Sequence, residues 1–142
     1  MKQELLKKIE TKTITVGVVG LGYVGLPLAV EKAKAGFKTI GFDVQDEKVK
    51  LVNEGHNYIG DVVDNDLKEL VNDGMLTATT DFSFVKDVDF IAICVPTPLD
   101  AHQQPDISYV KSSTEEISKY LTKGTMVVLE STTYPGTTEE LI

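Results

Sequence analysis

Two kinds of hydrophobic pattern alternate along this chain. Short apolar runs are separated by longer segments in which apolar residues recur every three or four positions. The short runs predict buried strands, and the longer segments predict amphipathic helices. We expect strands at about 14–19, 38–43, 76–79, 90–95 and 126–130, and helices at about 23–35, 47–54, 65–73 and 106–121.

This order of elements predicts the fold class. Strands that alternate with helices form a parallel sheet with helices on both faces. The run 90–95 is apolar throughout, which is typical of a strand covered on both sides. Gly36 and Gly55 follow predicted helices at positions that suit left-handed caps. We therefore expect an α/β domain, a Rossmann-type doubly wound parallel sheet, over residues 13–142, after an N-terminal extension at 1–12.

Both ends of the chain carry further expectations. The extension can form a short amphipathic helix with Leu5, Leu6 and Ile9 on one side. Residues 139–142 look like the start of another helix, but a single turn has no stability of its own. We interpret the sequence as a truncated single domain, a fragment of a longer protein that is incomplete at its C-terminus.

A glycine-rich turn joins the first predicted strand to the first predicted helix. It consists of Gly20, Leu21, Gly22, Tyr23, Val24 and Gly25. In this setting G-x-G-x-x-G indicates dinucleotide binding: the first glycine allows the turn, the second lets a pyrophosphate approach the backbone, and the third lets helix and strand pack closely. The helix N-terminus offers free N–H groups to the phosphates. On this motif alone, glycines that merely make a turn remain an alternative.

The second predicted strand ends in a carboxylate, Asp43. An acid at this position can accept hydrogen bonds from the ribose hydroxyls of an adenosine, and it would repel a 2′-phosphate. The sequence therefore predicts NAD rather than NADP as cofactor. The alternative is that Asp43 or Asp46 only caps the next helix, and Asp46 fits such a cap better.

Composition excludes several classes of function. The net charge of −8 argues against nucleic acid, which needs clustered basic residues. No apolar run is long enough to span a membrane, and the N-terminus lacks a signal core. The single cysteine, Cys94, rules out an internal disulfide and suits a reducing, cytoplasmic location. His56 and His102 show no metal-ligand spacing, so we expect no metal.

Two further strand ends carry small hydroxyl side chains. The fourth predicted strand ends in Val-Pro-Thr-Pro, a stiff loop that would present Thr97 towards the crevice above the sheet. The fifth is followed by Ser131 and Thr132, which would face the same crevice. The alternative is that these residues only form turns and cap helices.

At this point the sequence resembles the nucleotide-sugar 6-dehydrogenases, which comprise the UDP-glucose dehydrogenases and their UDP-N-acetylhexosamine relatives. The resemblance covers the chain from Thr15 onward. It rests on four ordered motifs: Gly-Leu-Gly-Tyr-Val-Gly-Leu-Pro from Gly20, Asp43 with Lys48, Cys-Val-Pro-Thr-Pro from Cys94, and Ser-Thr with Pro-Gly-Thr from Ser131. Gly-Tyr-Val-Gly-Leu-Pro-Leu and Leu-Glu-Ser-Thr look more like the N-acetylhexosamine branch.

The resemblance implies a role for each matching residue. Val24 and the surrounding loop would lie along the pyrophosphate, and Asp43 and Lys48 would hold the adenosine ribose. Without the family, Lys48 reads as an exposed helix lysine. Thr97 would lie near the nicotinamide. Thr132 would lie near the nicotinamide and the reacting carbon, where it would assist catalysis by ordering a water.

The resemblance also implies an activity. Such enzymes oxidise the C6 alcohol of a UDP-sugar to a carboxylate with two NAD. The reaction passes through a thioester on a cysteine from a later domain. The products usually enter cell-envelope polysaccharides. Cys94 lies in a predicted buried strand and is not expected to be that nucleophile. We expect the fragment, which lacks the central helix and the UDP-binding domain, to be inactive and monomeric, and the full-length protein to be a homodimer.

Three alternatives stay open at this stage. Other NAD enzymes of the 3-hydroxyacid or 6-phosphogluconate type share the glycine motif but lack the two later loops. A non-catalytic NAD-sensing module would have a cofactor site and no nucleophile, as these residues do. An S-adenosylmethionine methyltransferase can use a glycine loop and an acid on the second strand, although Gly25 disfavours it.

Overall fold

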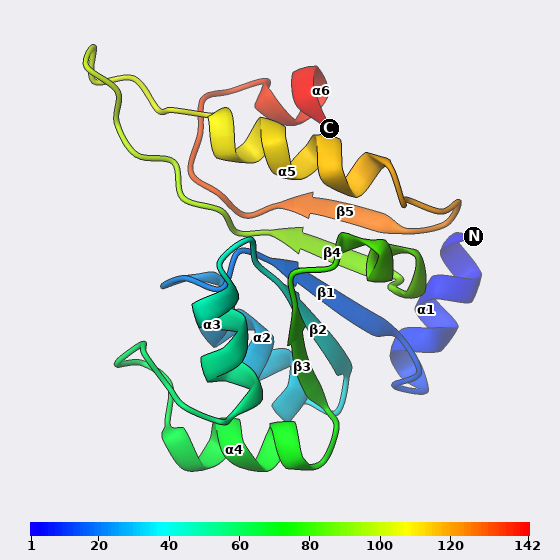
Figure 1. Ribbon diagram of the computed structural model, residues 1–142. Coiled ribbons are helices and arrows are strands. Elements are labelled where there is room, and N and C mark those ends of the chain that lie inside the picture. The colour runs from blue at the N-terminus through cyan, green and yellow to red at the C-terminus, as the bar shows by residue number, and fades with distance from the viewer.

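Five parallel strands form one sheet in the order β3-β2-β1-β4-β5 in the computed structural model, which describes residues 1–142 (Figure 1). The strands are β1 (Thr15–Val19), β2 (Lys38–Phe42), β3 (Leu76–Thr79), β4 (Phe90–Ile93) and β5 (Met126–Leu129). The helices are α1 (Lys2–Glu10), α2 (Gly25–Lys34), α3 (Asp46–Asn53), α4 (Asp64–Asn72), α5 (Ser108–Ser118) and α6 (Thr137–Leu141), with a 3₁₀ helix η1 (Phe82–Asp87). The predicted doubly wound parallel sheet is confirmed.

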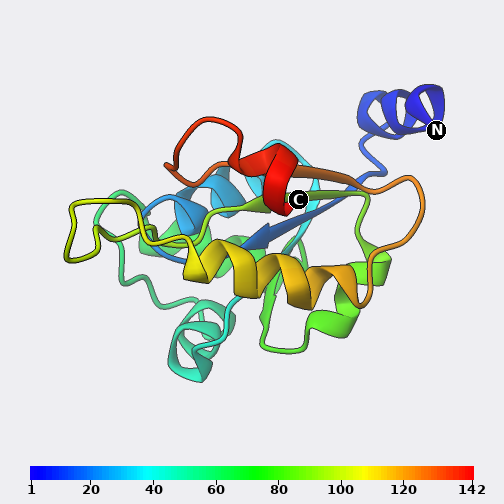
Figure 2. The same cartoon turned by 90° about the horizontal axis from the view of Figure 1, so that it is seen from above.

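The sheet is covered on both faces, so successive residues of β1 and β4 are buried on opposite sides. On one face, Val16 and Val18 of β1 pack with Leu26 of α2 and Leu67 of α4. On the other face a second cluster joins Val19, Phe42, Ile91 and Ile93 to Phe82 and Val85 of η1 and Ile117 of α5. Viewed from above, α2 and α5 lie on opposite sides of the strands (Figure 2). β4 contributes side chains to both clusters, which explains why the run at 90–95 is apolar throughout.

Two predictions about local structure were incomplete or wrong. The 3₁₀ helix η1 was not predicted, because its short sequence has no helical period; it begins where the Asp81 carboxylate accepts a hydrogen bond from Ser83 N. Asp46 does not cap α3. It is the first residue of the helix, Gln45 occupies the cap position, and no side chain caps it.

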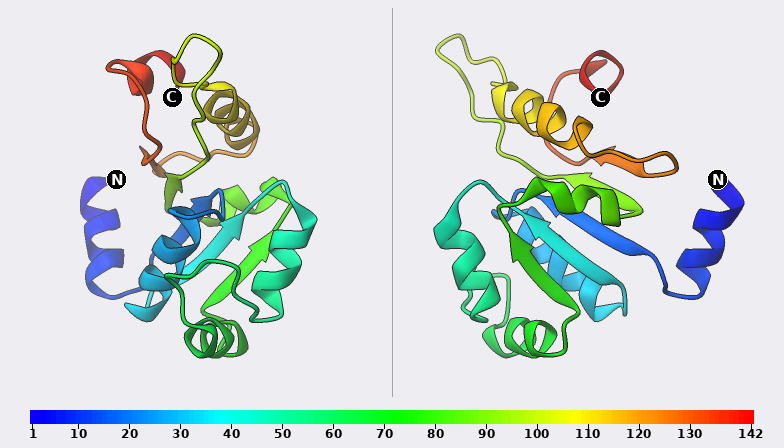
Figure 3. Two further views of the ribbon diagram at one scale, coloured as in Figure 1. Left: turned by 90° about the vertical axis from the view of Figure 1, so that its left-hand side faces the viewer. Right: turned by 45° about the vertical axis from the view of Figure 1, so that its right-hand side comes forward.

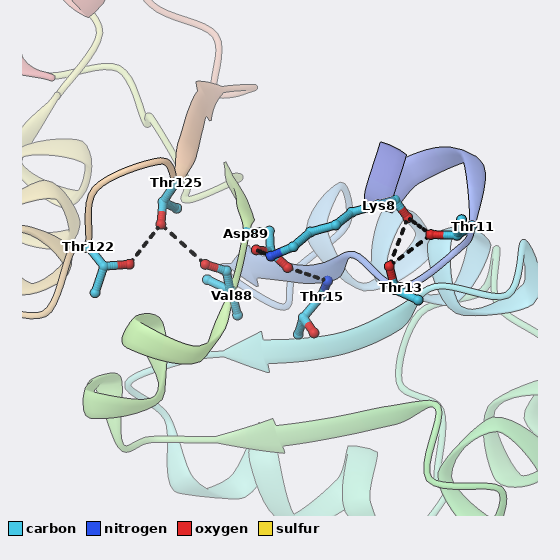
Figure 4. Close-up of polar contacts among 8 residues, drawn as sticks. All are labelled: Lys8, Thr11, Thr13, Thr15, Val88, Asp89, Thr122 and Thr125. Atoms are coloured by element: carbon cyan, nitrogen blue, oxygen red, sulfur yellow. Dashed lines mark hydrogen bonds and ion pairs between the residues drawn. The ribbon is translucent and has the colours of Figure 1, made fainter. Parts of the chain in front are cut away.

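Helix α1 lies at the end of the sheet where the strands begin (Figure 3). Of the three apolar residues predicted to share a side, Leu5 packs against the core, whereas Leu6 and Ile9 are exposed. The helix is fastened by an ion pair, in which Lys8 Nζ lies 2.6 Å from Asp89 Oδ1 (Figure 4). The second oxygen of Asp89 accepts a hydrogen bond of 3.0 Å from Thr15 N at the start of β1. Asp89 therefore links α1, β1 and β4.

Replacing Asp89 by alanine is expected to lower the free energy of unfolding by about 1 kcal/mol, because Thr15 N loses its acceptor. Burial raises the pKa of Asp89, but the Lys8 hydrogen bond and ion pair and the Thr15 N–H outweigh it, so the net pKa is lowered. The contribution is thus present above the unfolded carboxyl pKa of about 3.9 and is lost as pH falls through the folded value. Urea unfolding at neutral and acid pH measures this contribution to stability.

Asp87→Ala, at a neighbouring exposed acid without a hydrogen bond, is the control and should change the free energy of unfolding little. Equal losses for Asp89→Ala and Asp87→Ala would contradict the role of Asp89 in linking α1, β1 and β4.

Candidate functional site

Strand register brings four residues from distant parts of the chain into one row. Val19 pairs with Phe42 and Ile93, and Ile93 pairs with Leu129. The residues that follow these strand ends, Gly20, Asp43, Cys94 and Glu130, therefore sit side by side at the carboxyl edge of the sheet. A cleft of about 540 Å³ opens over this edge.

The cleft collects most of the predicted site residues. Its lining includes Gly20, Gly22, Tyr23, Val24, Asp43, Lys48, Thr97 and Thr132. Leu21 and Gly25, also predicted, do not line it. Both belong to the glycine turn but are buried, so they support it from within the protein.

The three glycines of the turn differ in what surrounds them. Gly20 has a φ of +91°, and a Cβ there would lie 2.8 Å from Cys94 O. A Cβ on Gly25 would lie 1.6 Å from Gly20 O, which confirms the predicted close packing of helix and strand. A Cβ on Gly22 would meet no atom within 4 Å. Gly20 and Gly25 are thus required by the fold, whereas Gly22 leaves space at the cleft.

The start of α2 presents unused hydrogen-bond donors. The N–H groups of Gly22, Tyr23, Val24 and Gly25 donate to no acceptor in the protein, and Tyr23 and Val24 have exposed side chains. Such free amides, together with the positive end of the helix dipole, form an anion site. The open space at Gly22 lets a phosphate come close to the backbone. The donors and the space together fit a pyrophosphate.

Asp43 is 8% exposed, and its carboxylate is fixed by two backbone amides. Oδ2 accepts a hydrogen bond from Leu21 N, and Oδ1 accepts one from Gln45 N, each of 2.9 Å. Asp43 thus holds the backbone just before α3 but does not cap the helix, because no side chain accepts a hydrogen bond from its first turn. Each carboxylate oxygen can accept a further hydrogen bond, so the acid can still bind hydroxyls.

Lys48 lies in the first part of α3 beside Asp43, where it is half-buried and makes no ion pair. A second hollow of about 320 Å³ adjoins the cleft and shares Gly20, Asp43, Lys48, Val95 and Pro96 with it. It continues between Val44 and the α5 residue Tyr109. This hollow could not be predicted from the sequence, because its walls come together only in the fold.

The hydroxyls of the later loops divide into two groups. Thr97 is half-buried and Thr132 exposed, and both line the cleft as expected. Ser131 also lines the cleft, and its Oγ donates to Val95 O at 2.8 Å, which holds the two loops together. Thr137 is buried and donates to Tyr134 O, which matches the turn-forming alternative. Thr97 and Thr132 are the stronger candidates for ligand contact, because their hydroxyls make no hydrogen bond within the protein, whereas that of Ser131 does.

Cys94 is buried at the floor of the cleft. Burial, with a smaller contribution from the charge of Glu130, raises the pKa of its thiol to about 12. At neutral pH it is therefore a protonated thiol and a poor nucleophile. No group of three His, Cys, Asp or Glu side chains could hold a metal ion, and no helix is both long and apolar enough to cross a bilayer.

Sequence reasoning missed two residues that line the cleft from the loop between α3 and α4, Tyr58 and Ile59. Tyr58 Oη donates a hydrogen bond of 2.5 Å to Leu21 O. The only local signal was an aromatic residue in a glycine-containing loop, which did not indicate contact with the turn at 20–25.

A parallel doubly wound sheet, a glycine turn with free amides and an acid on the neighbouring strand together define a dinucleotide-binding domain. A profile of the UDP-glucose/GDP-mannose dehydrogenase family, NAD binding domain, matches residues 14–142. The chain belongs to this family, and its cofactor is NAD. The resemblance found in the sequence is confirmed, and the methyltransferase and 3-hydroxyacid alternatives are set aside.

Named relatives agree with this family. UDP-N-acetyl-D-glucosamine 6-dehydrogenase of Pseudomonas aeruginosa is 40% identical over 129 residues, 91% of this chain and 30% of the relative. UDP-N-acetyl-D-mannosamine dehydrogenase of Pyrococcus horikoshii is 36% identical over 89% of this chain and 30% of the relative. The solved structure of UDP-D-ManNAc dehydrogenase from P. horikoshii matches with a TM-score of 0.84 at 35% identity, covering 90% of this chain and 31% of that one. The chain thus spans about 30% of the length of such relatives.

Proposed function

We propose that this chain supplies the cofactor site of an NAD-dependent dehydrogenase that oxidises the C6 alcohol of a UDP-N-acetylhexosamine to a carboxylate. The observation that carries the proposal is the row of Gly20, Asp43, Cys94 and Glu130 under one cleft, in a chain of this family. The choice of sugar is supported by relatives at 36–40% identity that are named for UDP-N-acetylated hexosamines. Bound NAD would supply the hydride acceptor.

Each part of the cofactor has matching surroundings. The amides of Gly22, Tyr23 and Val24 suit the pyrophosphate. Asp43 and Lys48 suit the adenosine ribose, and the adjoining hollow between Val44 and Tyr109 suits a flat adenine ring. Thr97 and Thr132 line the same cleft beside Cys94 and Glu130, which leaves this region for the nicotinamide.

These residues bind and orient, but they do not include a thiol nucleophile. Cys94 is the only cysteine, and its thiol is buried and protonated. Thr132 is exposed on the cleft, where it can order a water near the reacting carbon. We infer that residues 1–142 bind NAD without oxidising sugar, that they are monomeric, and that the whole protein is a cytoplasmic homodimer.

NADH fluorescence with the whole protein tests the activity. We expect two NADH per sugar with UDP-N-acetylglucosamine or UDP-N-acetylmannosamine, and a lower kcat/KM with UDP-glucose. Residues 1–142 alone should produce no NADH with any of the three. Whole protein that forms NADH with none of these sugars would contradict the proposed activity. NADH formation by residues 1–142 alone would contradict the inference that the nucleophile lies elsewhere.

A further inference from the structure

The peptide at the centre of the glycine turn is held from two sides by side chains. Leu21 N–H donates to Asp43 Oδ2 at 2.9 Å, and Leu21 C=O accepts from Tyr58 Oη at 2.5 Å. The Leu21 side chain is fully buried against β2, where a Cβ on Gly41 would lie 2.7 Å from it. Leu21 is thus anchored at its amide, its carbonyl and its side chain.

The carbonyl anchor matters because of the residues on either side. Gly20 and Gly22 flank Leu21, and glycine leaves the adjoining peptide units free to rotate. Leu21 C=O and Gly22 N–H belong to one trans peptide unit, in which the two bonds point in opposite directions. The hydrogen bond from Tyr58 therefore fixes the direction of Gly22 N–H, which has no acceptor in the protein. A rotated unit would instead bring a carbonyl oxygen towards an anionic ligand.

Tyr58 is itself firmly placed. Asn57 Oδ1 accepts a hydrogen bond from Ile59 N at 2.7 Å, Asn57 Nδ2 donates to Val62 O, and Asn57 N donates to Asp64 Oδ1 at 3.1 Å. Ile59 is buried in the core. Burial and the nearby charge of Asp43 raise the pKa of the Tyr58 phenol, so the hydroxyl stays protonated as a donor. The loop between α3 and α4 thus forms a rigid support for the glycine turn.

We propose that Tyr58 is a positioning residue for dinucleotide binding: through Leu21 O it holds the Leu21–Gly22 peptide so that Gly22 N–H is presented to the pyrophosphate. This inference rests on the proposed cofactor site. Asp43 holds the other side of the same residue, so the acid for the ribose and the amides for the pyrophosphate are joined in one unit. The loop at 54–63 becomes part of the cofactor site although it comes from outside the glycine motif.

The test compares ligands with and without a pyrophosphate. Tyr58→Phe keeps the ring and removes only Oη. NMR titration of the labelled chain should give an ADP-ribose Kd about tenfold higher for this variant, since one hydrogen bond that orients a donor is lost, and an adenosine Kd that is unchanged. In the free protein the Gly22 amide should exchange faster with solvent. Tyr120→Phe, at a remote tyrosine whose hydroxyl has no partner, is the matched control.

The outcomes separate the inference from the site on which it rests. Wild-type protein that binds neither ADP-ribose nor NAD would overturn the proposed site itself. Wild-type protein that binds ADP-ribose, with Tyr58→Phe binding equally well, would overturn only the role of Tyr58. Equal losses for ADP-ribose and adenosine would also overturn it, because Tyr58 would then act on the nucleoside or on the fold as a whole. Loss confined to ADP-ribose, with unchanged thermal stability, supports it.

Discussion

Gly22→Ala is expected to keep its fold and to bind NAD at least 100-fold more weakly. A methyl group at this position meets no protein atom within 4 Å, so folding is not obstructed. The same methyl occupies the space through which a pyrophosphate would approach the free amides, and losing that approach is worth roughly 3 kcal/mol. Its φ lies outside the left-handed region, so alanine should leave the melting temperature equal or slightly higher. Calorimetric titration with NAD and a thermal melt measure both effects.

Two other glycines serve as controls. Gly25→Ala puts a methyl 1.6 Å from Gly20 O, so this variant should lose stability as well as binding. Gly60→Ala, also in open space but outside the cleft, should change neither. If Gly22→Ala bound NAD as the unmodified chain does, the pyrophosphate would not lie on this turn.

Asp43→Asn is expected to lose both NAD affinity and stability. Two backbone N–H groups donate to the carboxylate, but an asparagine offers one oxygen and one NH₂ group. One buried amide therefore faces another donor, at a cost of about 2 kcal/mol. Because the loop and the ribose site both depend on this acid, NAD should bind roughly 100-fold more weakly. Urea unfolding and NAD titration report the two effects separately.

Asp46→Asn provides the comparison, because Asp46 is exposed and has no hydrogen-bond partner. It should match the unmodified chain in both measurements. Normal stability in Asp43→Asn would contradict its role in holding the turn. Normal NAD affinity would contradict its role at the ribose.

The residues at the carboxyl edge of the sheet could be predicted, because in a parallel sheet they are the residues that directly follow each strand along the chain. Once the apolar runs are assigned to strands, their carboxyl ends must meet at one edge, and the residues that follow must share one crevice. This places Gly20, Asp43, Thr97 and Thr132 together without knowledge of any contact, and all four line the cleft. The glycine pattern also predicted which element would pack closely, as Gly25 shows.

The features that could not be predicted depend on tertiary contacts between segments that share no recognisable sequence pattern. Tyr58 reaches Leu21 only because a loop after α3 folds back over the glycine turn. The cap alternative for Asp46 failed because α3 begins at Asp46 itself, which leaves Gln45 in the cap position. Ser131 lines the crevice as expected, but the hydrogen bond from its hydroxyl to Val95 O, which joins the two loops, was not predicted.

A single comparative titration tests whether this edge of the sheet is an NAD site. Calorimetry of residues 1–142 with NAD and with NADP should show one NAD per chain, and NADP at least tenfold weaker, since its 2′-phosphate would meet the carboxylate of Asp43. Equal or tighter binding of NADP, or no binding of NAD at millimolar concentration, would contradict the assignment.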